Sequence, residues 1–254
     1  MPQKVQETSM MHINYKSVLV ASAILSVGLF TAQAAEDLPI YNGVVNYTGS
    51  APGSYSYDEA TGVMTINGCG ADIWGTSDAF YYVYTTQEQD VDFDYYVKLN
   101  SFTGGIDQGW MKAGLMVREA SGEDYDPETG EFCGYTFDGN ARYYSVQSQR
   151  SDTSKSSNLK WITQWRDYVG ADVNDDRSKR YGTYVYPQWQ RLRRIGSMYY
   201  SFVSADGENW EQLWSEDTSK WVDGPLGSWF TPDLAVGIAV TSHDASSSDA
   251  VCKA

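Results

Sequence analysis

The chain has 254 residues and a formal net charge of −15 at pH 7. Such an acidic surface repels phosphate backbones, which argues against nucleic acid as a partner and suits solubility and divalent cations. Aromatic residues make up 15% of the chain. That richness is typical of β-sheet packing, and also of surfaces that stack on sugar rings.

The first 35 residues have the pattern of a secretory signal peptide. A basic region with Lys4 and Lys16 precedes an apolar run at 17–30, and Ala32 and Ala34 have the spacing of a signal peptidase site. The alternative is a membrane anchor, but the run is shorter than the roughly 20 residues that cross a bilayer. We therefore expect an N-terminal signal helix, a secreted protein (extracellular, cell-surface or periplasmic) and no membrane span in the mature chain.

Residues 36–254 are expected to form a single domain of short strands. Along Val91–Asn100, apolar side chains alternate with polar ones, the period-2 pattern of a strand with one wet face. Further strands are expected at Val63–Asn67, Ala79–Thr85, Trp110–Glu119, Arg142–Gln149, Trp189–Ile195, Met198–Ser204, Trp210–Ser215 and Leu234–Thr241. Many short strands without intervening helices predict a sandwich or barrel.

Two hairpins and two long loops connect these strands. Tyr57–Val63 and Ser204–Trp210 read as hairpins, and the Asp206-Gly207 step of the second supplies the positive φ angles of a tight turn. Residues 121–134 and 158–182 are polar or irregular and are expected to be loop insertions, since long loops are often functional.

Several motifs together resemble one known family. They are Gly68–Phe80, Lys112–Glu119, Trp189–Gly196, Ser204–Trp210 and Val236–His243. In order and spacing these motifs resemble the bacterial secreted jelly-roll domains of the concanavalin A-like lectin/glucanase superfamily. The resemblance implies an all-β, two-sheet antiparallel jelly-roll sandwich. It implies little about chemistry, because the superfamily contains lectins, glycosidases and inert spacers.

The chain also departs from the family pattern. The two long loops look like insertions, and the family usually continues beyond the position of Ala254. We therefore expect either a short final strand or a chain that is a fragment of a longer one.

A glucanase of this superfamily needs two carboxylates on one strand, so that both point into the cleft. The nearest string here is Glu123–Glu128, but Pro127 interrupts it and its intervening residues are not apolar. We interpret the string as an acidic loop, so no catalytic residue is predicted and an enzyme is the less favoured reading.

Two acidic strings are candidate calcium sites, since hard cations prefer carboxylate and amide oxygens. The candidate ligands are Asp124, Asp126, Glu128, Asp172, Asn174 and Asp176. The second string resembles the start of an EF-hand loop, but Arg177 stands at the glycine position and Thr183 at the glutamate position. A looser site or an ordinary solvated turn are the two readings left open.

The candidate sugar-stacking residues are Trp161, Trp165, Tyr168 and Trp189. The first three lie in the predicted loop, where aromatic side chains are often ligand contacts. A small core beneath that loop is the alternative.

A second candidate patch contains Asp72, Trp74 and Asp78, which could contact a hydroxylated ligand or simply support a turn and the core; the turn is the favoured reading. Arg118 and Arg194 match family positions, and we expect each to pair with a buried aspartate rather than with a ligand.

Cysteine and histidine are scarce. Cys69, Cys133 and Cys252 allow one disulfide, with three possible pairs left open. His243 is the single histidine after residue 35. These counts indicate neither a zinc site nor a conventional catalytic triad.

Taken together, the sequence favours a secreted non-catalytic module that binds polysaccharide or surface glycan, with calcium as the one candidate cofactor. A glycoside hydrolase-like enzyme and a structural spacer of the cell envelope are the alternatives. The oligomeric state is open.

Overall fold

A computed structural model describes residues 39–47, 49, 52–104, 110–150, 159–176, 186–227, 233–244 and 250–254. Within these ranges the chain is all-β, with one short 3₁₀ helix at Thr218–Lys220 (η1). In the same ranges, no helix has both the length and the apolar character that crossing a bilayer requires. The expected signal helix at residues 1–35 lies outside the described residues.

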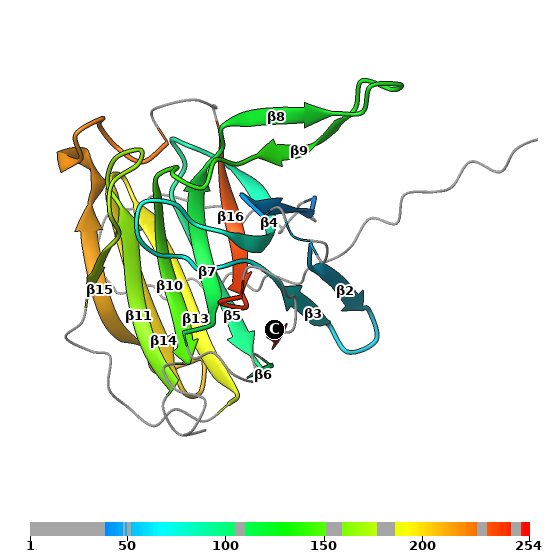
Figure 1. The fold of residues 1–254 in the computed structure, drawn as a ribbon. Helices are drawn as coiled ribbons and strands as arrows, with labels where there is room; N and C mark the ends of the chain where they lie inside the picture. The colour runs from blue at the N-terminus through cyan, green and yellow to red at the C-terminus, as the bar shows by residue number, and fades with distance from the viewer. Residues whose placement is uncertain are drawn as a thin grey trace, which may run out of the picture.

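The largest sheet has seven antiparallel strands in the order β1-β4-β16-β7-β10-β11-β12 (Figure 1). Their bounds are Tyr41–Val45 (β1), Phe80–Glu88 (β4), Asp233–Thr241 (β16), Lys112–Glu119 (β7), Tyr143–Arg150 (β10), Leu159–Arg166 (β11) and Asn174–Asp176 (β12). Strands distant in sequence are therefore neighbours, because β16 pairs with both β4 and β7.

Two four-stranded antiparallel sheets lie against one side of this large sheet. The first has the order β15-β14-β13-β5, with bounds Glu211–Asp217, Met198–Ser204, Gln188–Ile195 and Phe93–Leu99. The second has the order β2-β3-β17-β6, with bounds Ser54–Asp58, Val63–Gly68, Ala250–Lys253 and Ser101–Thr103. The all-β, antiparallel expectation is confirmed.

The predicted strands are all present, with ends shifted by at most three residues. The predicted alternation of buried and exposed side chains along Val91–Asn100 is wrong for its first residue. Phe93 and Leu99 are buried as expected, but Val91 precedes the strand and is exposed. The Tyr57–Val63 and Ser204–Trp210 turns do connect paired strands, β2 to β3 and β14 to β15.

The two predicted loops were wrong in part. Residues 121–134 contain strand β8 (Gly122–Tyr125) and most of strand β9 (Phe132–Thr136), a hairpin that projects from the body (Figure 1). Residues 158–182 contain β11 and β12, which complete the seven-stranded sheet. Polar side chains hid the strands of the β8–β9 hairpin, because backbone pairing does not require an apolar face. Strand β11 was hidden because both of its faces are buried, so that no alternation of apolar and polar residues marks it.

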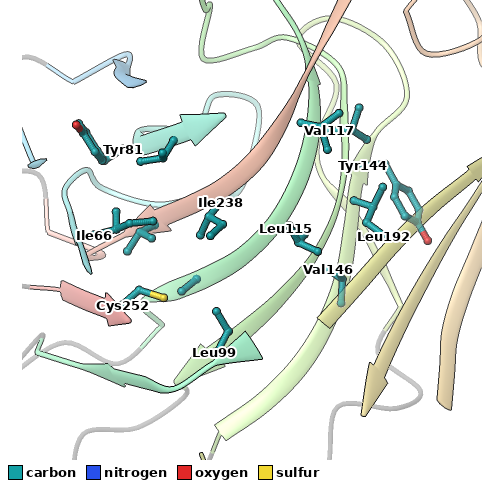
Figure 2. Close-up of a cluster of buried hydrophobic side chains, with 14 of the residues drawn as sticks. Ile66, Tyr81, Leu99, Leu115, Val117, Tyr144, Val146, Leu192, Ile238 and Cys252 are labelled. Atoms are coloured by element: carbon teal, nitrogen blue, oxygen red, sulfur yellow. The ribbon is translucent and has the colours of Figure 1, made fainter. Parts of the chain in front are cut away.

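The main core lies between the large sheet and the smaller ones. Figure 2 shows Leu115, Val117, Tyr144 and Val146 on the side of the large sheet that faces Leu192 of β13. We call this side the inner face. Burial of such side chains is the principal stabilising contribution in a sandwich.

Hydrogen bonds also join the layers. The Gln190 amide of β13 accepts from the Leu115 backbone N–H at 3.0 Å and donates to the Ala113 carbonyl at 3.3 Å.

The outer face of the large sheet carries a second apolar cluster. It contains Phe80, Tyr82, Tyr84, Met116 and Tyr135, the last of these from β9. The base of the β8–β9 hairpin therefore covers the β4 side of this face.

Candidate functional site

In the sheet β15-β14-β13-β5, successive side chains along β13 and β14 point alternately to the core and to the outer surface. Along β13, Gln188, Gln190, Leu192 and Arg194 are buried, and the residues between them are partly exposed. Strand β14 repeats the pattern, with Tyr200 and Phe202 partly exposed. Because these outward positions carry aromatic rings and arginines, the sheet presents a rigid aromatic surface to solvent.

Four rings define this surface, which we call the aromatic face: Tyr96, Trp189, Phe202 and Trp210. The Tyr96 ring centroid lies 6.0 Å from that of Trp189 and 6.2 Å from that of Trp210. Register explains the grouping, because Arg191 is paired with Tyr96 on one side and with Phe202 on the other.

Cations pack against these rings. The Arg191 guanidinium lies 5.4 Å from the ring centroids of both Phe202 and Trp210, and the Lys98 amine lies 5.8 Å from that of Trp189. Arg191 also makes two hydrogen bonds to Asp94 of β5, which raise the pKa of Arg191 above its usual value. These contacts hold the rings in fixed positions.

The β14–β15 turn supports Trp189 from one side. Ser204 Oγ accepts hydrogen bonds from the backbone N–H groups of Asp206 and Gly207. The Asp206 carboxylate accepts from the backbone N–H groups of Glu208 and Asn209. Gly207 has φ +80°, and a Cβ there would lie 2.8 Å from the Trp189 ring. The turn therefore needs glycine both for its conformation and for its contact with Trp189.

A cavity of about 600 Å³ opens beside the aromatic face. Its floor is the inner face of the large sheet, including Val83, Leu115 and Ile238, and its walls come from β5 and from the β2–β3 hairpin. Tyr96, Lys98 and Trp189 also line it. Ligand pockets of about 300–1,000 Å³ are commonly apolar with a few polar groups at the rim.

Three of the predicted sugar-stacking residues lie elsewhere. Trp161 is 2% exposed and belongs to the main core, because β11 is a strand whose inner face is covered. Trp165 packs against the same core and stacks on Trp214 with centroids 5.7 Å apart. Tyr168 is exposed and follows β11 of the large sheet, whereas Trp189 lies on β13 of a different sheet. The expectation of a group of loop aromatics around Trp161 was therefore wrong.

Asp72 and Trp74 lie at the end of the large sheet's outer face. Asp72 pairs with the buried Lys112 amine and lies 3.4 Å from His243 Nε2, and the Lys112 amine lies 5.5 Å from the Trp74 ring centroid. Burial alone would raise the pKa of Asp72, but the hydrogen bond with His243 and the Lys112 charge lower it below its usual value.

Asp78 is fully buried and serves the interior. Its two oxygens accept from Arg118 at 2.8 Å and from Arg166 at 2.7 Å. Burial raises the pKa of Asp78, against the opposing effect of both guanidinium groups. The predicted pairing of Arg118 with a buried aspartate is confirmed. Arg194 instead donates to the backbone carbonyls of Gln89 and Gly196, so its predicted pairing was wrong.

The acidic strings serve local turns. Asp126 accepts from the backbone N–H groups of Glu128 and Thr129, which lowers its pKa, and Asp172 accepts from Val173. Asp124 lies in β8, Asn174 and Asp176 in β12. Among the described residues, no three acidic, histidine or cysteine side chains gather in the way a metal ion requires.

The cysteines are free thiols in this structure, and none of the three possible disulfide pairs is formed. Cys69 and Cys252 are buried, and Cys133 is exposed on β9. Burial raises the pKa of both Cys69 and Cys252 to about 12.

Sequence reasoning identified Trp189 but missed its neighbours Tyr96, Phe202 and Trp210. A signal for Tyr96 was present, since alternation along Val91–Asn100 places this aromatic ring on the polar side of the strand. The two-residue connection between β13 and β14 is a local signal that these strands pair. Nothing local in the sequence indicates that β5 lies beside β13, because that depends on sheet order.

Comparisons with known proteins concern the fold. No protein-family model matches the chain, and no curated protein matches it. A functionally unknown protein from Saccharomyces cerevisiae is similar in structure, with a TM-score of 0.50 and 14% identity over 79% of this chain and 91% of that one. A GH43 protein from Bacillus licheniformis has a TM-score of 0.51 and 15% identity over 79% of this chain and 33% of that one. This chain therefore spans about a third of the GH43 protein, and at these identities the likeness shows a shared fold alone.

Proposed function

We propose that this protein is a secreted, non-catalytic carbohydrate-binding domain of the concanavalin A-like jelly-roll type, and that the aromatic face contacts the glycan. One observation carries the proposal: Tyr96, Trp189 and Trp210 form a single partly exposed group beside a cavity, with Tyr96 and Trp189 on paired strands and Trp210 directly before β15. The basic and apolar pattern of residues 1–35 supports export.

Aromatic rings suit this role because a sugar ring has an apolar C–H face that stacks on them, while tyrosine and tryptophan keep a polar edge for hydroxyl groups. The aromatic face is preorganised, since Arg191 and the Gly207 turn hold its rings before any ligand arrives. A preordered surface loses less conformational entropy on binding.

The cavity extends the same surface inward. Lys98 and Asn100 supply amine and amide groups, whereas the floor below them is apolar. A glycan stacked on Trp189 would therefore find hydrogen-bond donors at its edge.

Binding is favoured over hydrolysis by the carboxylates near the aromatic face. A glycosidase needs two carboxyl groups about 5–10 Å apart and available to the substrate. Asp94 is engaged by Arg191, and Asp92 accepts from the Gly196 N–H. The similarity to a GH43 protein is no argument for hydrolysis by this chain, since it shows a shared fold alone.

The test is retention on insoluble cellulose, chitin and xylan, together with a glycan array, using the full chain. Trp189→Ala and Tyr96→Ala are each expected to weaken retention about tenfold or more, which corresponds to about 1.4 kcal/mol of lost binding. Tyr125→Ala is the matched control, because Tyr125 is an exposed tyrosine on the distant β8–β9 hairpin.

Unchanged retention in both aromatic-face variants would contradict the proposal. Absence of wild-type binding to every polymer and every arrayed glycan would also contradict it and favour a structural spacer. Near-ultraviolet circular dichroism of each variant separates lost binding from lost folding.

A further inference from the structure

The two four-stranded sheets are joined at one bend of the chain. Strand β5 ends at Leu99 and β6 begins at Ser101, so Asn100 alone lies between a strand of the first sheet and a strand of the second. In the described ranges, β5 and β6 are each the last strand of their sheet. The two small sheets are therefore two halves of one layer that share this bend.

Strand β17 fills the layer on one side of the bend. It pairs with β3 along one edge and with β6 along the other, and its last residue Lys253 lies opposite Thr65 and Ser101. Past it, the Ala254 backbone exchanges two hydrogen bonds with Met64 of β3, at the end marked C in Figure 1. Because both neighbours are antiparallel to β17, β5 and the β2–β3 turn lie beyond its end. They flank a position that no described strand occupies.

The cavity of about 600 Å³ lies at this position. Asn100 and Ala254 line its end nearest β17, Val97 lines it along β5, and Thr61–Val63 of the β2–β3 turn line the opposite side. The interior of a protein is normally packed as densely as an organic crystal. A space of this size between two strands and above a sheet therefore has the bounds of one further strand.

Side chains of β5 show where the layer is incomplete. Alternation places Phe93, Tyr95, Val97 and Leu99 on the core side of this strand. Phe93 and Leu99 at its ends are buried, but Tyr95 and Val97 between them are only partly buried. Both nevertheless pack against the main core and line the cavity. The middle of β5 is therefore the part that an added strand would cover.

Charge indicates what kind of strand fits. Among the described residues that line the cavity, Lys98 has the one charged side chain. It is exposed, its amine lies 5.8 Å from the Trp189 ring centroid, and it forms no ion pair within the described part of the chain. Its neighbour Arg191 is instead paired with Asp94. A carboxylate directly opposite Lys98 on an adjacent strand would be a favourable cross-strand pair.

We propose that the cavity is a docking slot for an extended peptide segment of another protein, which adds a strand antiparallel to β5 and completes the layer. Addition of a strand to an open sheet edge gains affinity from main-chain hydrogen bonds and specificity from alternate side chains. The segment has about seven residues, as β5 does. Its apolar side chains face Val83, Leu115 and Ile238, and an acidic residue lies opposite Lys98. The slot does not require the aromatic face to bind glycan.

The probe is a fluorescein-labelled synthetic peptide of this length in which valine alternates with glutamate and threonine. Fluorescence anisotropy with the full chain measures its binding, and a scrambled peptide of the same composition is the control. The alternating peptide is expected to bind about tenfold or more tightly than the scrambled one, and to raise Tm by about 5 °C or more at roughly 100 times its Kd.

Amide hydrogen exchange shows whether a strand has been added. Backbone amides of Phe93–Leu99 are expected to exchange about tenfold or more slowly in the complex, because main-chain pairing protects them. Val97→Trp fills the cavity from β5 and should weaken peptide binding about tenfold or more without lowering Tm. Val222→Trp is the matched control, since Val222 is an exposed valine outside the cavity lining, and it should change neither quantity.

A charge exchange tests the acidic position. A second peptide carries lysine in place of glutamate, and the ratio of the two affinities removes the effect of the net charge of the protein. Lys98→Glu is expected to shift this ratio about tenfold or more toward the lysine peptide, because attraction and repulsion change places. Lys220→Glu makes the same change of charge away from the cavity and should leave the ratio unchanged.

Three outcomes would overturn the slot: no binding of the alternating peptide, equal binding of the scrambled one, or binding that leaves the β5 amides unprotected. Binding of sodium decanoate but not of the peptide would show a cavity for small amphiphiles and would overturn it as well. Failure of the aromatic face appears separately, as wild type that binds the peptide but retains no polysaccharide.

Discussion

The outer faces of the two main sheets reverse the usual distribution of side chains. On the large sheet, charged and amide groups such as Asp78, Arg118 and Gln164 are buried. On the sheet β15-β14-β13-β5, aromatic rings such as Trp189 and Phe202 are partly exposed. Burying polar groups and exposing apolar ones both cost stability. Neither arrangement is therefore explained by folding alone.

The same chemical pair occurs on both faces in different surroundings. Arg118 and Asp78 are entirely shielded from solvent, whereas Arg191 and Asp94 are partly exposed. Breaking a buried pair leaves a charge without compensation, but breaking a surface pair leaves a charge that water can solvate. The two pairs therefore offer a direct comparison of what burial does.

The largest expected effect is that of Asp78→Ala. It leaves two buried guanidinium groups without their carboxylate and should lower the free energy of unfolding by about 3–5 kcal/mol. Asp94→Ala is the matched change on the aromatic face and should cost about 1 kcal/mol or less. Urea denaturation measures both. Equal losses would break the comparison.

Two tryptophans extend the comparison between buried and partly exposed side chains. Trp161→Ala removes a buried ring and should lower the free energy of unfolding by about 3–5 kcal/mol without a specific effect on glycan contact. Trp189→Ala should cost about 1 kcal/mol or less in stability, but it should reduce polysaccharide retention. If Trp189→Ala were as destabilising as Trp161→Ala, the aromatic face would belong to the core instead.

The smallest expected effect is a pH dependence at Asp72. The pKa of this carboxyl is lowered in the folded state, by its hydrogen bond with His243 and by the Lys112 charge, relative to about 3.9 in the unfolded chain. The stability it contributes is therefore present above about pH 4 and is lost as the pH falls through the folded pKa.

Urea unfolding of wild type and Asp72→Asn over a pH series checks this prediction. The two free energies of unfolding should differ at neutral pH and converge in acid, where wild-type Asp72 also becomes neutral. A difference that stays constant down to pH 2 would show that Asp72 does not titrate with folding.

Much of the fold was predictable because alternation and turn residues are local signals. Apolar and polar residues alternate along Val91–Asn100, which contains β5, and the Asp206-Gly207 step predicts the positive φ that Gly207 adopts. Strand β11 was missed for a physical reason. Its inner residues Trp161 and Thr163 and its outer residues Gln164 and Arg166 are all buried, so hydropathy does not separate its two faces.

The candidate site was predictable only in fragments. Trp189 was identified, and Tyr96 could have been, as an aromatic ring on the wet side of a strand. The partners of each ring could not be identified, because they come from strands whose adjacency follows from sheet order. The open position between β5 and the β2–β3 turn is invisible in a sequence for the same reason, since it depends on where the neighbouring strands end.

By itself, then, the sequence determined the long strands apart from β11, the β2–β3 and β14–β15 turns, and that Arg118 pairs with a buried carboxylate. Only the tertiary structure decided that Trp161 is covered and that Trp189 meets solvent. The reason is that extension and turning are properties of the local backbone. Exposure instead depends on which sheet, if any, lies against each face of a strand.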